Sequence, residues 1–196
     1  MLRAPGCDPD LSMDFLVPEM EQAIQCLKTG KAPGIEDIHA EYIKHQGKNA
    51  TDWLRSFLSA CLRLLKLPKI WRRAKVIALP KPNKPSKDPK GYRPISLLCI
   101  PFKLLERLIL ARITPVIDPQ LPKEQAGFRS GGSTTDQVTL LCQDIEDSFQ
   151  AREKAGAVFL DLTAAYDTVW LRGLQLKLLE TIPDKHMVSF MAKAAG

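Results

Sequence analysis

The sequence predicts an α+β fold in which helices predominate. Most of the chain repeats apolar residues at helical spacing, two short β-branched segments flank a proline-rich connection, and a third strand-like run covers residues 157–162. Helices and strands do not alternate as βαβ units, which argues against a doubly wound parallel sheet. Because one strand cannot form a sheet, the last strand needs partners from the hairpin or from chain beyond this sequence.

Composition narrows the class of protein. The chain has 196 residues, of which 45% are hydrophobic, and no apolar stretch reaches the roughly 18 to 20 residues of a membrane span. The N-terminus lacks the apolar core of a secretory signal, so we expect an intracellular protein, cytoplasmic or nuclear or both, with no membrane partner. Five scattered cysteines without a C-x-x-C pair indicate neither a disulfide framework nor a zinc site. A net charge of +6 favours an anionic partner.

Three helices are predicted in the first third. Apolar spacing indicates a helix that begins near Pro18 and ends before Gly30. A tight basic turn, "GKAPG", separates it from a shorter helix around residues 38–43. Residues 51–65 then form a strongly amphipathic helix that Pro68 closes.

A hairpin follows, with strands at residues 74–80 and 92–98. Prolines exclude helix and ladder bonding from its connection, which is therefore an extended exposed loop. This loop is either a site that carries cations or a soluble linker, and its lysines are Lys81, Lys84, Lys87 and Lys90.

The second half contains three more predicted helices and the strand. After a helix over residues 101–113 and a glycine-containing loop, Ser133 opens a helix with Asp136 three residues on, which is a capping-box pair. Its apolar face should be buried. The strand at 157–162 and a final helix at 171–182 complete the pattern.

Two carboxylates near the last strand suggest chemistry. Asp167 fits an N-cap at a strand-to-helix turn. Asp161 stands among apolar residues, where a buried carboxylate is costly unless a cation or metal compensates it. Phosphoryl transfer commonly uses divalent ions held by such side chains.

Five motifs in order give the site a context: "KAPGIEDI", "WRRAKVIALPKP", "GYRPISLLCIPFKLLERLI", "EQAGFRSGGSTTDQ" and "VFLDLTAAYDTV". Together they resemble the reverse transcriptases of non-LTR (LINE-type, jockey-like) retrotransposons, over about residues 12–191. The resemblance implies a right-hand polymerase fold, with residues 1–14 as a disordered leader, 15–155 as fingers and 156–196 as the beginning of a palm. It also implies Mg²⁺ or Mn²⁺ as cofactor in the full-length enzyme. RNA template, DNA primer and dNTP would be the partners.

The resemblance also assigns residues. Asp161 matches the metal-binding catalytic aspartate, with the Leu162 carbonyl beside the same ion. Tyr166 matches the aromatic residue that packs under the incoming sugar and rejects a 2′ hydroxyl, whereas Asp167 matches a position not credited with metal binding. Arg93 matches the fingers arginine on the nucleotide phosphates, and Lys81 is the candidate for its companion lysine.

Further basic residues are candidates for nucleic-acid contacts. Arg129 in "QAGFR" and Lys31 in "GKAPG" suit template phosphates, with Lys84, Lys87 and Lys90 in the proline-rich loop. Alternatives stay open here: Phe128 of "QAGFR" as a core residue, and Lys31 as a solvated turn residue.

The chain departs from the family in one respect. No adjacent Asp-Asp pair occurs, nor, after Asp161, the Q-G stretch that normally precedes it, and we expect no thumb within these residues. One catalytic carboxylate cannot organise two ions, so we expect a polymerase fragment that is inactive alone and binds no metal tightly. The alternatives are a non-catalytic basic nucleic-acid-binding module and a non-functional truncated element copy.

Overall fold

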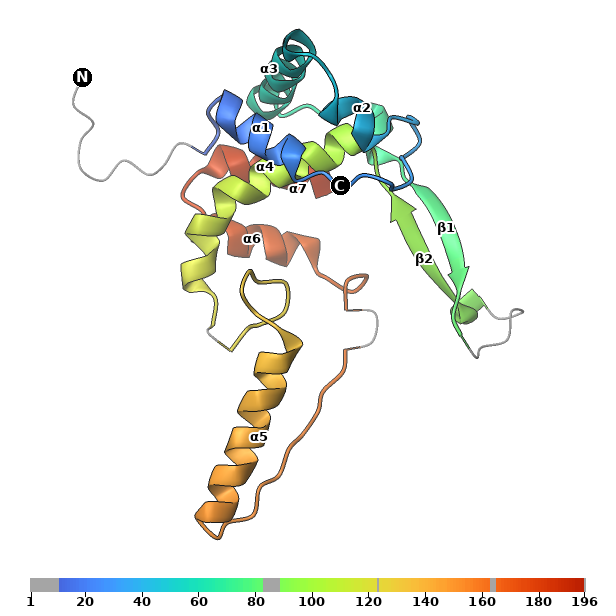
Figure 1. The fold of residues 1–196 in the computed structure, drawn as a ribbon. Helices are drawn as coiled ribbons and strands as arrows, with labels where there is room; N and C mark the ends of the chain where they lie inside the picture. Colours follow the sequence, from blue (N-terminus) through green and yellow to red (C-terminus); the bar gives the residue numbers. More distant parts are fainter. Residues whose placement is uncertain (1–10, 83–88, 123, 163–164, 196) are drawn as a thin grey trace, which may run out of the picture.

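The computed structural model describes residues 11–82, 89–122, 124–162 and 165–195. A helical body contains both the first helices and the last one, so the two ends of the described chain pack together (Figure 1). A β-hairpin projects from this body on one side, and a long helix extends away from it on another. The described part is mostly helical with one two-stranded antiparallel sheet, which agrees with the predicted α+β class.

The core lies among four helices of the body. These are α1 (Val17–Gln25), α3 (Lys48–Leu64), α4 (Ile100–Ile117) and α7 (Lys185–Ala195). Their apolar stripes face one another, which is the arrangement that removes most apolar surface from water. The largest fully buried side chains on these helices are Met20, Leu58, Leu62, Leu104, Leu105, Leu108, Met187, Val188 and Phe190.

The N-terminal helices follow the predicted pattern, although α1 ends earlier than predicted and α3 begins three residues earlier. Pro18 occupies the first turn of α1, as expected for a residue without an amide hydrogen. Gly30 has a φ of +66° in the turn that follows, a conformation that suits glycine. The short helix α2 (Ala40–Lys44) comes next, and a 3-10 helix, η1 (Lys69–Arg72), connects α3 to the hairpin.

The hairpin consists of β1 (Lys75–Pro80) and β2 (Tyr92–Leu97), close to the predicted strands. Its register pairs Lys75 with Leu97 and Pro80 with Tyr92. A 3-10 turn, η2 (Pro89–Gly91), leads into β2. The strands are largely exposed on both faces, so the ladder bonds rather than burial hold the hairpin.

The C-terminal third contains α5 (Thr134–Gln150) and α6 (Leu171–Thr181), with η3 (Asp118–Gln120) between α4 and α5. The predicted capping box is confirmed, because Ser133 accepts from the Asp136 amide and Asp136 accepts from the Ser133 amide. The predicted burial of the apolar face of α5 is wrong: no residue of this helix is buried, and Val138 and Phe149 are exposed. In Figure 1 the helix extends away from the body, which explains this exposure.

The predicted palm strand does not form among the described residues. Residues 157–162 run without regular structure and pair with neither hairpin strand. Val158, Phe159 and Leu160 are each more than four-fifths exposed, at 86%, 82% and 90%. The physical reason is the one that the sequence raised: a strand needs a neighbour, and the described residues provide none there.

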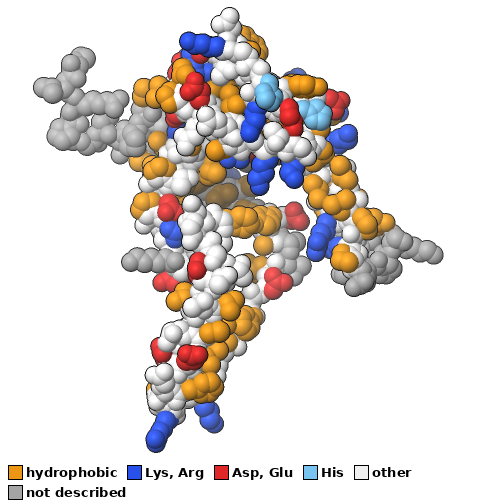
Figure 2. All heavy atoms as spheres, viewed as in Figure 1, with side chains coloured by type: hydrophobic (Ala, Val, Ile, Leu, Met, Phe, Trp, Pro, Cys, Tyr) orange, Lys and Arg blue, Asp and Glu red, His pale blue; other side chains and the backbone are white. Residues whose placement is uncertain are grey.

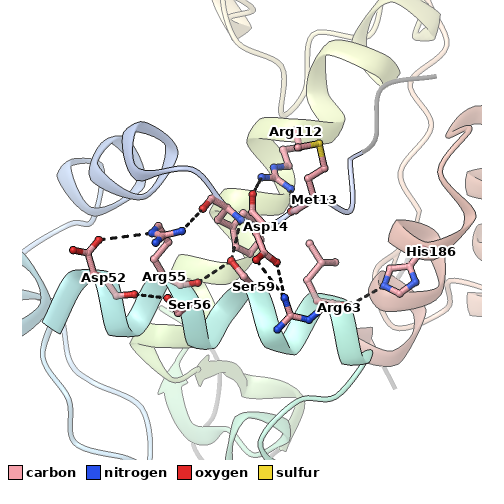
Figure 3. Close-up of polar contacts among 11 residues, drawn as sticks. Met13, Asp14, Asp52, Arg55, Ser56, Ser59, Arg63, Arg112 and His186 are labelled. Carbon is pink, nitrogen blue, oxygen red and sulfur yellow. Dashed lines mark hydrogen bonds and ion pairs between the residues drawn. The ribbon is translucent and has the colours of Figure 1, made fainter. Parts of the chain in front are cut away.

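Helix α7 is absent from the sequence-based prediction. Asp184 caps its first turn, accepting from the His186 and Met187 amides at 2.9 Å each. Burial works to raise the pKa of Asp184, but these bonds and one from the Ser12 hydroxyl at 2.6 Å outweigh it and lower that pKa. His186 Nε2 lies 2.9 Å from the Leu62 carbonyl, which joins α7 to α3 (Figure 3).

Residues 11–14, the end of the predicted disordered leader, belong to the packed body, whereas residues 1–10 of that leader lie outside the described residues. The guanidinium of Arg112 in α4 donates to the carbonyls of Leu11, Met13 and Asp14 at 2.6 to 3.1 Å (Figure 3). It also forms two 2.7 Å bonds with the Glu19 carboxylate and lies 4.5 Å from the Phe15 ring. These bonds lower the pKa of Glu19.

Among the described residues, no helix is both long enough and apolar enough to span a membrane.

Candidate functional site

Two cations of the predicted nucleotide site share one face of the hairpin. Arg93 of β2 is opposite Leu79 of β1, and the Lys81 amide donates to the Gly91 carbonyl at 2.7 Å, which extends the ladder. Because side chains alternate along a strand, Lys81, two residues beyond Leu79, projects on the same face as Arg93. This alternation makes Lys81 and Arg93 diagonal neighbours on the extended ladder.

The turn that carries Lys31 is fixed to the base of the hairpin. A Cβ on Gly34 would lie 2.7 Å from backbone atoms of residues 98–99, so glycine is needed for this close approach. Glu36 accepts from the Ile100 amide at 2.7 Å and satisfies a free donor at the start of α4. Lys31 itself is exposed, in the part of the molecule where β2 leads into α4.

Arg129 is held by its own loop. Its Nε and Nη2 contact the two oxygens of Asp118 at 3.0 and 3.1 Å, and its Nη1 donates to the Pro122 carbonyl at 2.8 Å. This bidentate pair closes the loop between α4 and α5. A phosphate contact of Arg129 therefore stays a prediction, and such a contact has to share the guanidinium with Asp118.

The "QAGFR" and "AAYD" motifs meet in space. The Phe128 ring is edge-on to the Tyr166 ring, with centroids 6.3 Å apart and planes at 87°. Phe128 is 98% exposed and has a φ of +61°, so its interpretation as a core residue is wrong. The structure thus brings the predicted sugar-contacting tyrosine next to the loop of Arg129.

Asp161 and Leu162 lie on the exposed, unpaired segment rather than at the end of a strand. Backbone ladder bonds therefore do not fix the Asp161 carboxylate. Asp167 lies in a turn at residues 165–168, and the N-cap position of α6 is Trp170, so Asp167 does not cap that helix. Across the described residues, no three His, Cys, Asp or Glu side chains come together as a possible metal site.

Part of the predicted cationic loop lies outside the described residues. This applies to Lys84, Lys87 and the side chain of Lys90. Figure 2 shows Lys and Arg side chains along the edges of the helical body and the hairpin that face the opening between them, with Asp or Glu side chains on its C-terminal side. The positive edges of this recess suit a polyanion.

The cysteines that the structure describes differ in burial. Cys61 and Cys99 are buried, whereas Cys26 and Cys142 are exposed. Burial, with Glu36 close by, raises the pKa of the Cys99 thiol to about 11. A thiol with this pKa stays protonated at neutral pH and is a poor nucleophile.

Sequence reasoning missed two residues that shape the site. Glu36 bonds across 64 residues to Ile100, and no local spacing signals such a contact. Phe128 follows a glycine in a loop, and this loop setting is the only sequence signal that its side chain is exposed. Its neighbour Tyr166 was identified by motif alone.

Comparisons with known proteins agree with the motifs. A family model described as reverse transcriptase (RNA-dependent DNA polymerase) matches residues 79–193. The probable RNA-directed DNA polymerase from transposon BS of Drosophila melanogaster is 38% identical over 169 residues, which are 85% of this chain and 19% of that protein. The RNA-directed DNA polymerase from mobile element jockey of Drosophila funebris is 35% identical over 161 residues, which are 81% of this chain and 18% of that protein. The chain thus spans less than a fifth of the length of these curated relatives.

Proposed function

This chain belongs to the reverse transcriptase family, and from that premise we propose that it forms the fingers and the first part of the palm of an RNA-directed DNA polymerase. In this function a primer 3′ hydroxyl, losing its proton, attacks the α-phosphate of a dNTP paired with an RNA template, and the bond to the β-phosphate breaks to release pyrophosphate. The observation that carries the proposal is the hairpin ladder, which sets Arg93 opposite Leu79 and bonds the Lys81 amide to the Gly91 carbonyl, so that both cations fall on one face by strand alternation. Two cations that reach one ligand suit a triphosphate, whose charge they neutralise during transfer.

The template would lie along the recess beside the hairpin. Lys31, at the fixed turn, and Arg129, next to the Phe128 and Tyr166 rings, contribute cations to this path. Phosphate contacts of this kind position a nucleic acid without reading its sequence. Tyr166 is 76% exposed, and in this proposal the sugar of the incoming nucleotide covers its ring.

The family generally uses divalent metal ions, which in the complete enzyme activate the primer hydroxyl. The described residues do not fit a two-metal site, because Asp161 has no cluster of further ligands around it. We therefore derive no step through a metal in this chain. Exposure of residues 158–160 and of the apolar face of α5 supports the view that further chain covers them in the active enzyme.

A second candidate function is a non-catalytic nucleic-acid-binding module. The net charge of +6 and the positive edges of the recess favour it, and it needs no metal centre. Both functions require nucleic-acid binding, but only the first requires a dNTP site on the hairpin. A copy without function would have neither property.

The experiment measures affinity for an RNA–DNA template–primer and then for a matched dNTP in its presence. We expect salt-dependent template–primer binding, and dNTP protection of the hairpin in hydrogen exchange, which Arg93→Ala abolishes. Lys75→Ala, at the other end of the hairpin, is the matched control. Template–primer binding without dNTP protection supports the binding module, and absence of both contradicts both functions.

A further inference from the structure

An aromatic groove lies on the helical body between α2, α3 and η1. It has a volume of about 550 Å³, a usual size for a binding site. Its walls are almost wholly apolar, and no charged side chain lines it. The lining residues used below are Tyr42, Trp53, Phe57, Pro68 and Trp71.

The rings of this groove form an ordered stack. Trp53 and Phe57, one turn apart on α3, are parallel within 3° with centroids 5.4 Å apart. Phe57 then meets Trp71 edge-on at 5.9 Å, and Trp71 contacts Phe102 of the core at 6.0 Å. The buried end anchors the stack, while its outer member, Trp53, is 66% exposed. Such a rigid ring at a surface is a platform on which a further planar group can stack.

Tyr42 forms part of the opposite wall. Its side chain is 67% exposed, and its ring meets the His39 ring edge-on at 5.8 Å. The groove therefore presents exposed aromatic side chains from two different helices. Exposure of the apolar surface of two large rings to water is unfavourable. A ligand stacked on these rings would remove that surface from water.

The two rims of the groove differ in charge. Along η1, the 3-10 repeat of three residues places Pro68 and Trp71 on the groove side and the exposed Lys69 and Arg72 together on an adjacent side. From Trp53 to position 87 the sequence contains ten Lys or Arg residues and no Asp or Glu. The η1 rim is thus uniformly positive.

The α2 and α3 side of the groove carries both signs, with Glu41 and Lys44 on α2 and Lys48 and Asp52 on α3. Asp52 pairs with Arg55 at 3.8 Å, and Glu41 accepts from the Gly30 amide at 2.5 Å. An apolar floor with one positive rim fits a single strand, with its bases in the groove and its phosphates along η1. The positive rim would also repel the lysine-rich and proline-rich loop of a second copy of this chain, so we do not expect that loop to occupy the groove.

We propose that this groove binds single-stranded RNA by stacking bases on Trp53 and Tyr42, with phosphates on Lys69 and Arg72. The inference rests on the proposed function only in taking RNA as the partner. The groove is separate from the hairpin face, so the two sites fail independently.

The test uses a fluorescein-labelled twelve-nucleotide oligouridylate and the full chain, with affinity measured by fluorescence anisotropy. Loss of one base stack weakens binding about 5-fold or more, so we expect this from Trp53→Ala and from Tyr42→Ala. Trp53→Phe keeps a ring and most of the affinity. Phe149→Ala, which removes an equally exposed ring on α5, leaves affinity unchanged, and circular dichroism checks the fold of each variant.

Salt dependence tests the rim. Each phosphate contact to a single strand contributes about −0.7 to the slope of log K against log salt, so Lys69→Ala with Arg72→Ala reduces the slope by about 1.4. The proposal is overturned if Trp53→Ala and Tyr42→Ala bind like Phe149→Ala. It is also overturned if Trp53→Ala abolishes binding of a proline-rich peptide and leaves RNA affinity intact. Arg93→Ala should keep oligouridylate binding, which separates this site from the nucleotide site.

Discussion

Arg112 should be the most sensitive polar position of the fold. Arg112→Met removes both bonds to Glu19 and the bonds to the carbonyls of residues 11–14, and it leaves the Glu19 carboxylate partly buried without its partner. The side chains of the pair are only 10% and 27% exposed. Removing one member of a buried pair costs 3 to 5 kcal/mol, and the residual exposure of Glu19 places the expected loss at the lower end, about 3 kcal/mol.

Urea unfolding followed by circular dichroism measures this loss. With a slope of about 2 kcal/mol per M, the midpoint should fall by about 1.5 M. Arg63→Ala is the control, because its ion pair with Asp14 spans 3.2 Å but both side chains are more than half exposed. Such a pair contributes less than about 1 kcal/mol. A fall for Arg112→Met no larger than that for Arg63→Ala would refute the buried role of Arg112.

Three further predictions concern packing, pH and thiol reactivity. Gly34→Ala drives a methyl group into the backbone of residues 98–99 and should destabilise the fold by about 1 to 3 kcal/mol in the same urea assay. Gly156→Ala, where open space surrounds the new methyl group, should leave stability unchanged. Equal effects of the two substitutions would contradict the close approach at Gly34. The lowered pKa of Glu19 adds stability that is present above its ordinary value of 4.5 and is lost as the pH falls through the folded-state pKa, so Glu19→Gln should flatten the acid limb of a pH–stability curve. Iodoacetamide at pH 8, followed by mass spectrometry, should label Cys26 well before Cys99, whose pKa is about 11; comparable rates would show that Cys99 is accessible.

The parts of the fold that depend on local signals follow from the sequence. Helix spacing, the proline at the start of α1, the capping box of Ser133 and the hairpin strands are all encoded within a few residues of one another. The family also follows, because five ordered motifs carry far more information than any one of them.

The errors share one cause, which is dependence on distant partners. Periodicity showed that α5 has an apolar face and that residues 157–162 favour a strand, but it cannot say what covers them. Trp53 lies on an apolar stripe, and only the structure places it at the exposed end of an aromatic stack. Arg112 lies on another such stripe, and the carbonyls that it binds are about 100 residues away.

Primer extension on an RNA template with Mg²⁺ tests the central claim most directly. Asp161 lies on an exposed segment, and the described residues place no cluster of metal ligands around it, so the 196-residue chain should bind the template–primer but incorporate no dNTP. Incorporation by this chain that Asp161→Asn abolishes would contradict the account, because it would show that a complete catalytic centre forms from these residues alone.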